Sequence, residues 1–213
     1  MSDKILISVW SDYVCPFCYL EEPVLEQLEL AFGAQVEVDW RAFELRPDPV
    51  PTLDPNGEYL RTTWARSVYP MAAQRGMTLR LPPVQPRSRL ALEAERFARR
   101  YGLGKPMRQA FFRAFFERGR DIGDIEVVLD IGGNVGIDVA RLRVALENGE
   151  HAEAVSHDQR QAQALGISGV PALLMQRHGE AAENALLLSG AQPFQVISRA
   201  VSEILRDASS QAG

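Results

Sequence analysis

Cys15 and Cys18 are the only cysteines among the 213 residues of the chain, and they are separated by two residues. This C-x-x-C pair follows a short apolar run and precedes a segment with helical periodicity. A thiol at the start of a helix meets unpaired backbone N–H groups and the positive end of the helix dipole. Both favour the thiolate, which is the nucleophile in thiol–disulfide exchange. The pattern therefore predicts a redox-active dithiol.

Two other interpretations of the pair are weaker. A structural disulfide here would close a loop of about four residues and stabilise the fold by roughly 2 kcal/mol, which is little for a chain that can bury a large core. A zinc site needs two more ligands, but His151, His157 and His178 lie far away in sequence and none pairs at ligand spacing. We therefore expect no metal, with a metal half-site and chemically idle cysteines as the alternatives.

Composition limits the partners and the compartment. Hydrophobic residues make up 46% of the chain and charged residues 24%, as in ordinary soluble domains. The net charge of −5 argues against nucleic acid or an anionic membrane as a partner. The N-terminus lacks an export pattern, and no apolar run reaches membrane length. We expect a cytoplasmic protein, where reducing conditions favour a cycling pair over a fixed bridge; the sequence does not indicate an oligomeric state.

The elements around the dithiol form a β-α-β unit. Residues 5–10 read as a strand, residues 16–32 as a helix ended by Gly33, and residues 36–43 as a second strand with alternating polarity. Pro16 falls in the first helical turn, where its missing N–H costs nothing. Because a helix crosses between the two strands, we expect them to be parallel.

The middle of the chain is predicted to be helical. Pro-rich loops at 46–57 and 82–86 flank a helical segment over 58–75, which Pro70 is expected to interrupt. Further helices are expected over 89–101 with Ser88 as N-cap, over 106–118 from Pro106, over 125–132 after Asp124, over 139–148 after Asp138, and over 151–165. In the second of these, a phenylalanine cluster reads as helical core, with part of it lining a substrate groove as the alternative.

The chain returns to strand-like sequence near its end. Residues 172–176 and 185–188 are predicted to form a hairpin, and residues 193–207 a final helix. The expected order is therefore β-α-β, a helical segment of roughly 100 residues, and then α-β-β-α.

Four stretches resemble the DsbA-like branch of the thioredoxin superfamily and, within it, the FrnE-type oxidoreductases. They are residues 11–19 (SDYVCPFCY), 121–124 (DIGD), 166–172 (GISGVPA) and 189–193 (SGAQP). The resemblance implies an α/β thioredoxin-like fold with a large all-helical insertion. Residues 1–50 and 160–213 would form the thioredoxin-like domain, and residues 51–159 the inserted helical domain.

The resemblance also implies the roles of the site residues. Pro171 would be cis and face the dithiol, against the alternative of an ordinary trans proline at the start of an edge strand. Cys15 would attack a substrate disulfide and Cys18 would resolve the mixed disulfide. The Val170 backbone would pair with an extended substrate, and three further residues would contribute to the contact surface: Pro16, Phe17 and Gly169.

The same resemblance implies which cofactor, substrates and proton-transfer groups to expect. The redox-active disulfide would serve without any further cofactor. The substrates would be proteins with thiols or disulfides, or a low-molecular-weight thiol such as glutathione. Asp12 and Glu44 are candidates for proton transfer to or from Cys18, with solvated surface carboxylates as the alternative.

The sequence departs from the family pattern in two ways, and two other functions are alternatives to disulfide exchange. The dipeptide between the cysteines contains no histidine, so we do not expect extreme oxidising power, and no second cysteine pair exists for an internal relay. Related folds serve glutathione-dependent kappa-class transferases and 2-hydroxychromene-2-carboxylate isomerases, which typically lack the second cysteine. A chaperone-like binding module with an apolar groove in the helical segment is the other alternative.

Overall fold

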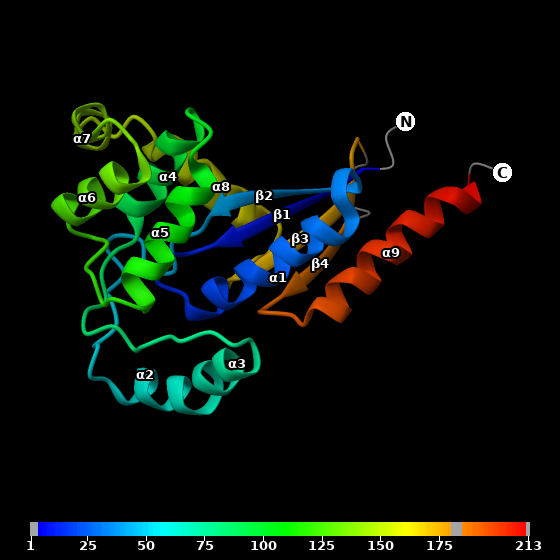
Figure 1. The fold of residues 1–213 in the computed structure, drawn as a ribbon, viewed down its shortest axis with the longest axis horizontal. Coiled ribbons are helices and arrows are strands. Elements are labelled where there is room, and N and C mark those ends of the chain that lie inside the picture. The colour runs from blue at the N-terminus through cyan, green and yellow to red at the C-terminus, as the bar shows by residue number, and fades with distance from the viewer. Residues whose placement is uncertain (1–3, 180–184, 212–213) are drawn as a thin grey trace.

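A computed structural model describes residues 4–179 and 185–211 of the chain, with side chains through residue 206. One mixed sheet has the strand order β2-β1-β3-β4 (Figure 1). Its strands are β1 (Ile5–Ser11), β2 (Val36–Ala42), β3 (Ala172–Arg177) and β4 (Leu186–Ser189). β2 is parallel to β1, whereas β3 is antiparallel to β1 and β4 to β3. The predicted β-α-β unit and the C-terminal hairpin are therefore confirmed.

Two helices cover one face of this sheet. They are α1 (Pro16–Phe32), which begins and ends where the sequence predicts, and α9 (Phe194–Gln211). Their apolar side chains pack on alternate residues of β1, namely Ile5, Ile7 and Val9, which are fully buried. Gly33 ends α1 with a φ of 53°, a backbone conformation that glycine adopts without strain.

The dithiol lies far from the ends of the described chain. Because β1 leads directly into the turn that carries the cysteines, the turn sits at the opposite end of β1 from its first residue. Figure 1 shows that the start of β1 and the last turns of α9 lie together, at the end of the molecule away from the first turn of α1.

The opposite face of the sheet is covered by α8 (Ala152–Ala164). Trp10 and Leu174 point to this side and pack with Phe43, Ala162 and Ile167. Since Trp10 follows Val9 in β1, the two faces of the strand bury different cores.

Asp158 fixes α8 to the end of β2. Its side chain is 2% exposed and accepts a 2.8 Å hydrogen bond from the backbone N–H of Ala42. The guanidinium groups of Arg41 and Arg96 pair with the same carboxylate, and its backbone carbonyl accepts a 3.0 Å bond from the Trp10 indole. One buried carboxylate thus ties α8 to the strand end and to α4, on which Arg96 lies.

The helical segment packs beyond the dithiol end of the sheet (Figure 1). Its first part is α2 (Glu58–Thr63), a π-helical turn (Trp64–Val68) and α3 (Tyr69–Gln74), which run without a break. The predicted interruption at Pro70 is therefore wrong. Proline lacks an N–H and clashes with the carbonyl four residues earlier, and the wider π turn before it relieves both conflicts.

The remaining helices follow in sequence order: α4 (Arg89–Arg99), α5 (Gly104–Phe116), α6 (Ile125–Val135) and α7 (Val139–Glu147). Asp124 and Asp138 cap α6 and α7, as predicted, by accepting hydrogen bonds from backbone N–H groups. Ser88 precedes α4 but makes no capping hydrogen bond. α5 begins two residues before the predicted Pro106, which falls inside its first turn.

The dithiol turn and the helical segment share one hydrophobic core. The predicted phenylalanine cluster of α5 is fully buried, with Phe112 and Phe116 stacked on Tyr19. Tyr13 packs against the same cluster, so both tyrosines near the cysteines serve local packing.

Within residues 4–179 and 185–211, no helix is both long and apolar enough to cross a membrane.

Candidate active site

Cys15 is the N-cap of α1, in an extended conformation that ends the turn after β1. Its backbone N–H donates to the Asp12 carbonyl at 3.1 Å, and its own carbonyl accepts from the Cys18 N–H at 3.1 Å. Both thiols are free. Cys15 is 4% exposed and Cys18 is fully buried one helical turn deeper, so the first cysteine is the one that a substrate meets.

The surroundings of Cys18 favour its neutral thiol. Burial raises the pKa of Cys18 well above its usual range, and the hydrogen bond and charge of Cys15 act in the same direction. The Ser11 hydroxyl and the Asp12 backbone act in the opposite sense, with smaller effect. Cys18 is therefore protonated at neutral pH and must lose its proton before it can act as a nucleophile.

The loop before β3 meets the dithiol from the other end of the chain. The Cys15 thiol donates to the Val170 carbonyl, with 3.3 Å between sulfur and oxygen. The Val170–Pro171 peptide bond is cis, as the resemblance implies, and Pro171 directly follows the residue whose carbonyl accepts from the thiol. The Val170 backbone is only partly available to a substrate strand: its carbonyl accepts from Cys15, while its N–H has no partner within the described residues.

A cavity of about 400 Å³, here called the dithiol groove, opens beside Cys15. The four predicted contact residues all line it: Pro16, Phe17, Gly169 and Val170. Most of the rest of its wall comes from the two Pro-rich loops, from α2 and from the π turn, and further residues come from the dithiol turn, α5 and the loop before β3. These lining residues are Val14, Leu45, Arg46, Thr52, Leu53, Tyr59, Leu60, Thr63, Trp64, Pro82, Gln85, Pro86, Phe116 and Ser168.

Sequence reasoning missed this second wall. The Pro-rich composition identified 46–57 and 82–86 as loops but gave no sign that both fold over the dithiol. Phe116 belongs to the buried phenylalanine cluster and also reaches the groove, so the core and groove interpretations of that cluster both hold. Arg46 is the only charged residue among the lining residues, and most of the others are apolar.

The two candidate proton-transfer carboxylates occupy structural positions. The Asp12 carboxylate is fully buried and accepts from the backbone N–H groups of Val14, at 3.3 Å, and Leu45, at 2.7 Å, and from the Ser88 side chain. This use of Ser88 explains why it does not cap α4. Glu44 is buried and pairs with Arg89 at 2.7 Å. No described hydrogen bond joins either carboxylate to a thiol.

Asp12 makes folding stability depend on pH. Burial raises the pKa of its carboxyl from 3.8 to about 6, against the opposing effect of its hydrogen bonds. Because the folded pKa exceeds the unfolded one, the stabilisation is complete below pH 3.8 and is lost as pH rises through about 6. Its full size is roughly 3 kcal/mol.

We therefore expect the unfolding free energy of the wild type, relative to an Asp12→Asn variant, to fall between about pH 4 and about pH 7. Urea denaturation of both proteins across this range measures the difference. A difference that stays constant with pH would show that folding leaves the pKa of Asp12 unchanged.

Two thiols are the reactive groups that the site presents. Across the part of the chain that the structure describes, no three His, Cys, Asp or Glu side chains are placed to hold a metal ion. The geometry offers a sulfur at a helix N-terminus, a second sulfur buried behind it, and a mostly apolar groove beside the first.

Comparison with known proteins agrees with this geometry. Residues 6–202 match the sequence model of the DSBA-like thioredoxin domain family, so the chain belongs to that family. The uncharacterized protein YwbO of Bacillus subtilis (strain 168) is 37% identical over 176 residues, which are 79% of this chain and 86% of YwbO.

Solved structures share the fold over nearly the whole chain. The crystal structure of the probable DsbA oxidoreductase SCO1869 from Streptomyces coelicolor has a TM-score of 0.76 and 26% identity, covering 94% of this chain and 89% of that one. The cytosolic disulfide reductase DsbM from Pseudomonas aeruginosa has a TM-score of 0.67 and 19% identity, covering 97% and 98%. DsbM has also been solved with GSH. The fold is thus the DsbA-like thioredoxin fold with a helical insertion.

Proposed function

We propose that this protein is a thiol-disulfide oxidoreductase that exchanges disulfides through Cys15 and Cys18. The observation that carries the proposal is the placement of the Cys15 sulfur. It lies at the N-terminus of α1, 3.3 Å from the Val170 carbonyl and at the wall of the dithiol groove, with Cys18 buried behind it. Membership of the DSBA-like thioredoxin domain family supports the same chemistry.

The reaction proceeds in two exchanges. The Cys15 thiolate attacks one sulfur of a substrate disulfide, forms a mixed disulfide and releases the first substrate thiol. Cys18 then loses its proton and attacks the Cys15 sulfur, which releases the second substrate thiol and leaves a Cys15–Cys18 disulfide. The dithiol is oxidised and the substrate reduced, and the reverse sequence oxidises a substrate dithiol.

The residues around the sulfur have distinct roles in this proposal. Pro171 presents no N–H toward the thiolate, and the Val170 N–H is left to bind the backbone of a bound substrate. Pro16, Phe17 and Gly169 form the contact surface next to the mixed disulfide. Asp12 and Glu44 act by holding the loops of the groove rather than by carrying protons.

We further propose the FrnE-type branch, a cytoplasmic location, and proteins or a low-molecular-weight thiol such as glutathione as substrates. DsbM, a cytosolic protein of the same fold solved with GSH, supports the small thiol. The intact cysteine pair argues against the glutathione-dependent isomerase and transferase alternatives, and the position of the groove directly on Cys15 argues against a purely chaperone-like module.

Reaction of the reduced protein with bis(2-hydroxyethyl) disulfide tests this function. We expect the two thiols to be lost together, and alkylation followed by mass spectrometry to show an unlabelled protein lighter by two hydrogens. Added glutathione should then make the reaction catalytic, measured as continuous formation of glutathione disulfide while the added disulfide is reduced to 2-mercaptoethanol. If both cysteines stay fully alkylatable after prolonged exposure to the disulfide, the proposed chemistry is wrong.

A further inference from the structure

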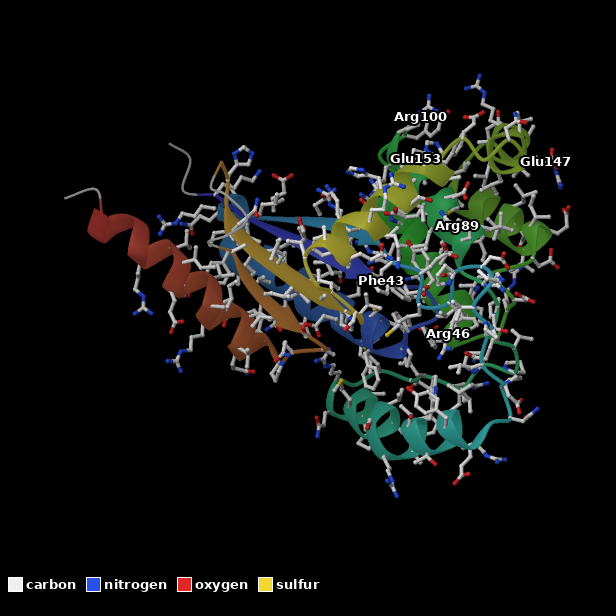
Figure 2. The ribbon with its side chains drawn as sticks, turned by 180° about the vertical axis from the view of Figure 1, so that it is seen from behind. Phe43, Arg46, Arg89, Arg100, Glu147 and Glu153 are labelled. Carbon is white, nitrogen blue, oxygen red and sulfur yellow. The ribbon has the colours of Figure 1, made fainter. Side chains whose placement is uncertain are left out.

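The charge of the dithiol groove is unbalanced. Arg46 is half-buried in its wall, and its guanidinium has no ion-pair or hydrogen-bond partner among the residues that the structure describes. The neighbouring arginines are all engaged: Arg87 pairs with Asp48, and Arg89 with Glu44. In Figure 2, Arg46 lies on the side of the molecule nearer α2 and α3, whereas Arg89 lies nearer α4 and α8.

The backbone around Arg46 is held in place, so the guanidinium is presented from a fixed base. The Arg46 carbonyl accepts a 2.9 Å hydrogen bond from Arg87, and the N–H of the preceding Leu45 donates to Asp12. Neither contact uses the Arg46 side chain. A ligand that fills the apolar groove would remove water from this guanidinium, which is costly unless the ligand supplies a negative group. A carboxylate matches it with two parallel hydrogen bonds.

The size of the groove favours a small molecule. Five separate segments of the chain contribute to its wall, and its volume of about 400 Å³ falls in the range of small-ligand pockets. The net charge of the whole chain is −5, so long-range electrostatics would disfavour an anionic substrate. Any preference for an anion must therefore come from a local group, and Arg46 is the only charged residue among the described residues that line the groove.

We propose that Arg46 makes this site selective for low-molecular-weight disulfides that carry a carboxylate close to the reacting sulfur. This inference rests on the proposed function, because it concerns the substrate of the same exchange. During attack, the carboxylate binds Arg46 while the substrate sulfur meets Cys15. The exchange itself is unchanged: Cys15 bonds to one substrate sulfur, and the other leaves as the thiol that carries its own carboxylate.

A series of small symmetric disulfides tests the selectivity. Dithiodiglycolate and 3,3′-dithiodipropionate are anionic, bis(2-hydroxyethyl) disulfide is neutral, and cystamine is cationic. We expect the wild type to show a kcat/KM for its better anionic substrate at least about tenfold above that for the neutral one, as charge-assisted hydrogen bonding to Arg46 supplies. The anion with the higher kcat/KM shows which spacing between carboxylate and sulfur the site prefers.

Variants of Arg46 assign the preference to its charge. Arg46→Gln should reduce the ratio of anionic to neutral kcat/KM to about one, Arg46→Lys should retain part of it, and Arg46→Glu should favour cystamine. Arg66→Gln is the matched control: Arg66 is exposed on the π turn outside the groove, and its replacement changes the net charge equally. It should leave the ratio unaltered.

The outcomes separate this inference from the proposed function. If the neutral disulfide oxidises the dithiol but the wild type shows no anionic preference, or Arg46→Gln keeps it, the selectivity is wrong and the exchange chemistry stands. An equal loss of preference in Arg66→Gln would assign it to overall charge and overturn the role of Arg46. If no disulfide of the series reacts with the dithiol, the proposed function itself fails.

Discussion

Replacing Cys15 with serine is expected to abolish disulfide exchange, with kcat/KM falling at least about 10³-fold, as happens when a covalent nucleophile is removed. The remaining thiol, Cys18, is fully buried, and its pKa is raised well above the usual range, so it cannot take over the attack. Turnover of bis(2-hydroxyethyl) disulfide with glutathione measures the loss.

Cys18→Ser is the informative partner of that variant. It keeps the nucleophile Cys15 but lacks the resolving sulfur, so Cys15 should form a mixed disulfide that persists. Intact-mass analysis should show one substrate adduct per chain, removed by reducing agent. Similar reactivity of the two single variants, or an adduct on Cys18 in Cys15→Ser, would contradict the assignment of the two roles.

Loss of the Asp158 carboxylate is expected to destabilise the fold strongly. Asp158→Ala removes the partner of the Ala42 N–H and of two arginines that are themselves mostly buried. Breaking a buried charge pair in this way costs about 3–5 kcal/mol, and the partial exposure of Arg41 and Arg96 favours the lower end. Urea denaturation measures the loss.

Asp130→Ala provides the control. Asp130 also pairs with an arginine, Arg120, at 2.7 Å, but its side chain is 55% exposed. Its removal should cost less than about 1 kcal/mol. If the two variants lose similar stability, the Asp158 cluster contributes no more than an exposed ion pair, and α8 must be held by its apolar contacts and its other hydrogen bonds.

Local signals in the sequence were sufficient for the elements that carry the dithiol. The helix bounds at Pro16 and Gly33 follow from residues that act on their own backbone, and both agree with α1. The caps at Asp124 and Asp138 are confirmed for the same reason, since each carboxylate binds an N–H two or three residues away.

Contacts between residues far apart in the sequence could not be predicted from such local signals. Serine is a residue type that often caps helices, but the Ser88 side chain donates a hydrogen bond to Asp12 instead, and Asp12 lies in another part of the chain. Asp158 pairs with Ala42 across 116 residues. Nothing local to Arg46 indicates that its loop covers the dithiol, because that depends on how the helical segment packs on the first turn of α1. The link between Val170 and Cys15 spans 155 residues and was inferred only from family resemblance.

The placement of the chain ends has a practical consequence for measuring the redox chemistry of this molecule. The start of β1 and the last turns of α9 share the end of the molecule that is remote from the first turn of α1 (Figure 1). A tag or surface linker at either end therefore tethers the protein with Cys15 directed away from the support. Immobilised protein should exchange with dissolved disulfides as freely as protein in solution, so its potential can be measured on an electrode or sensor chip.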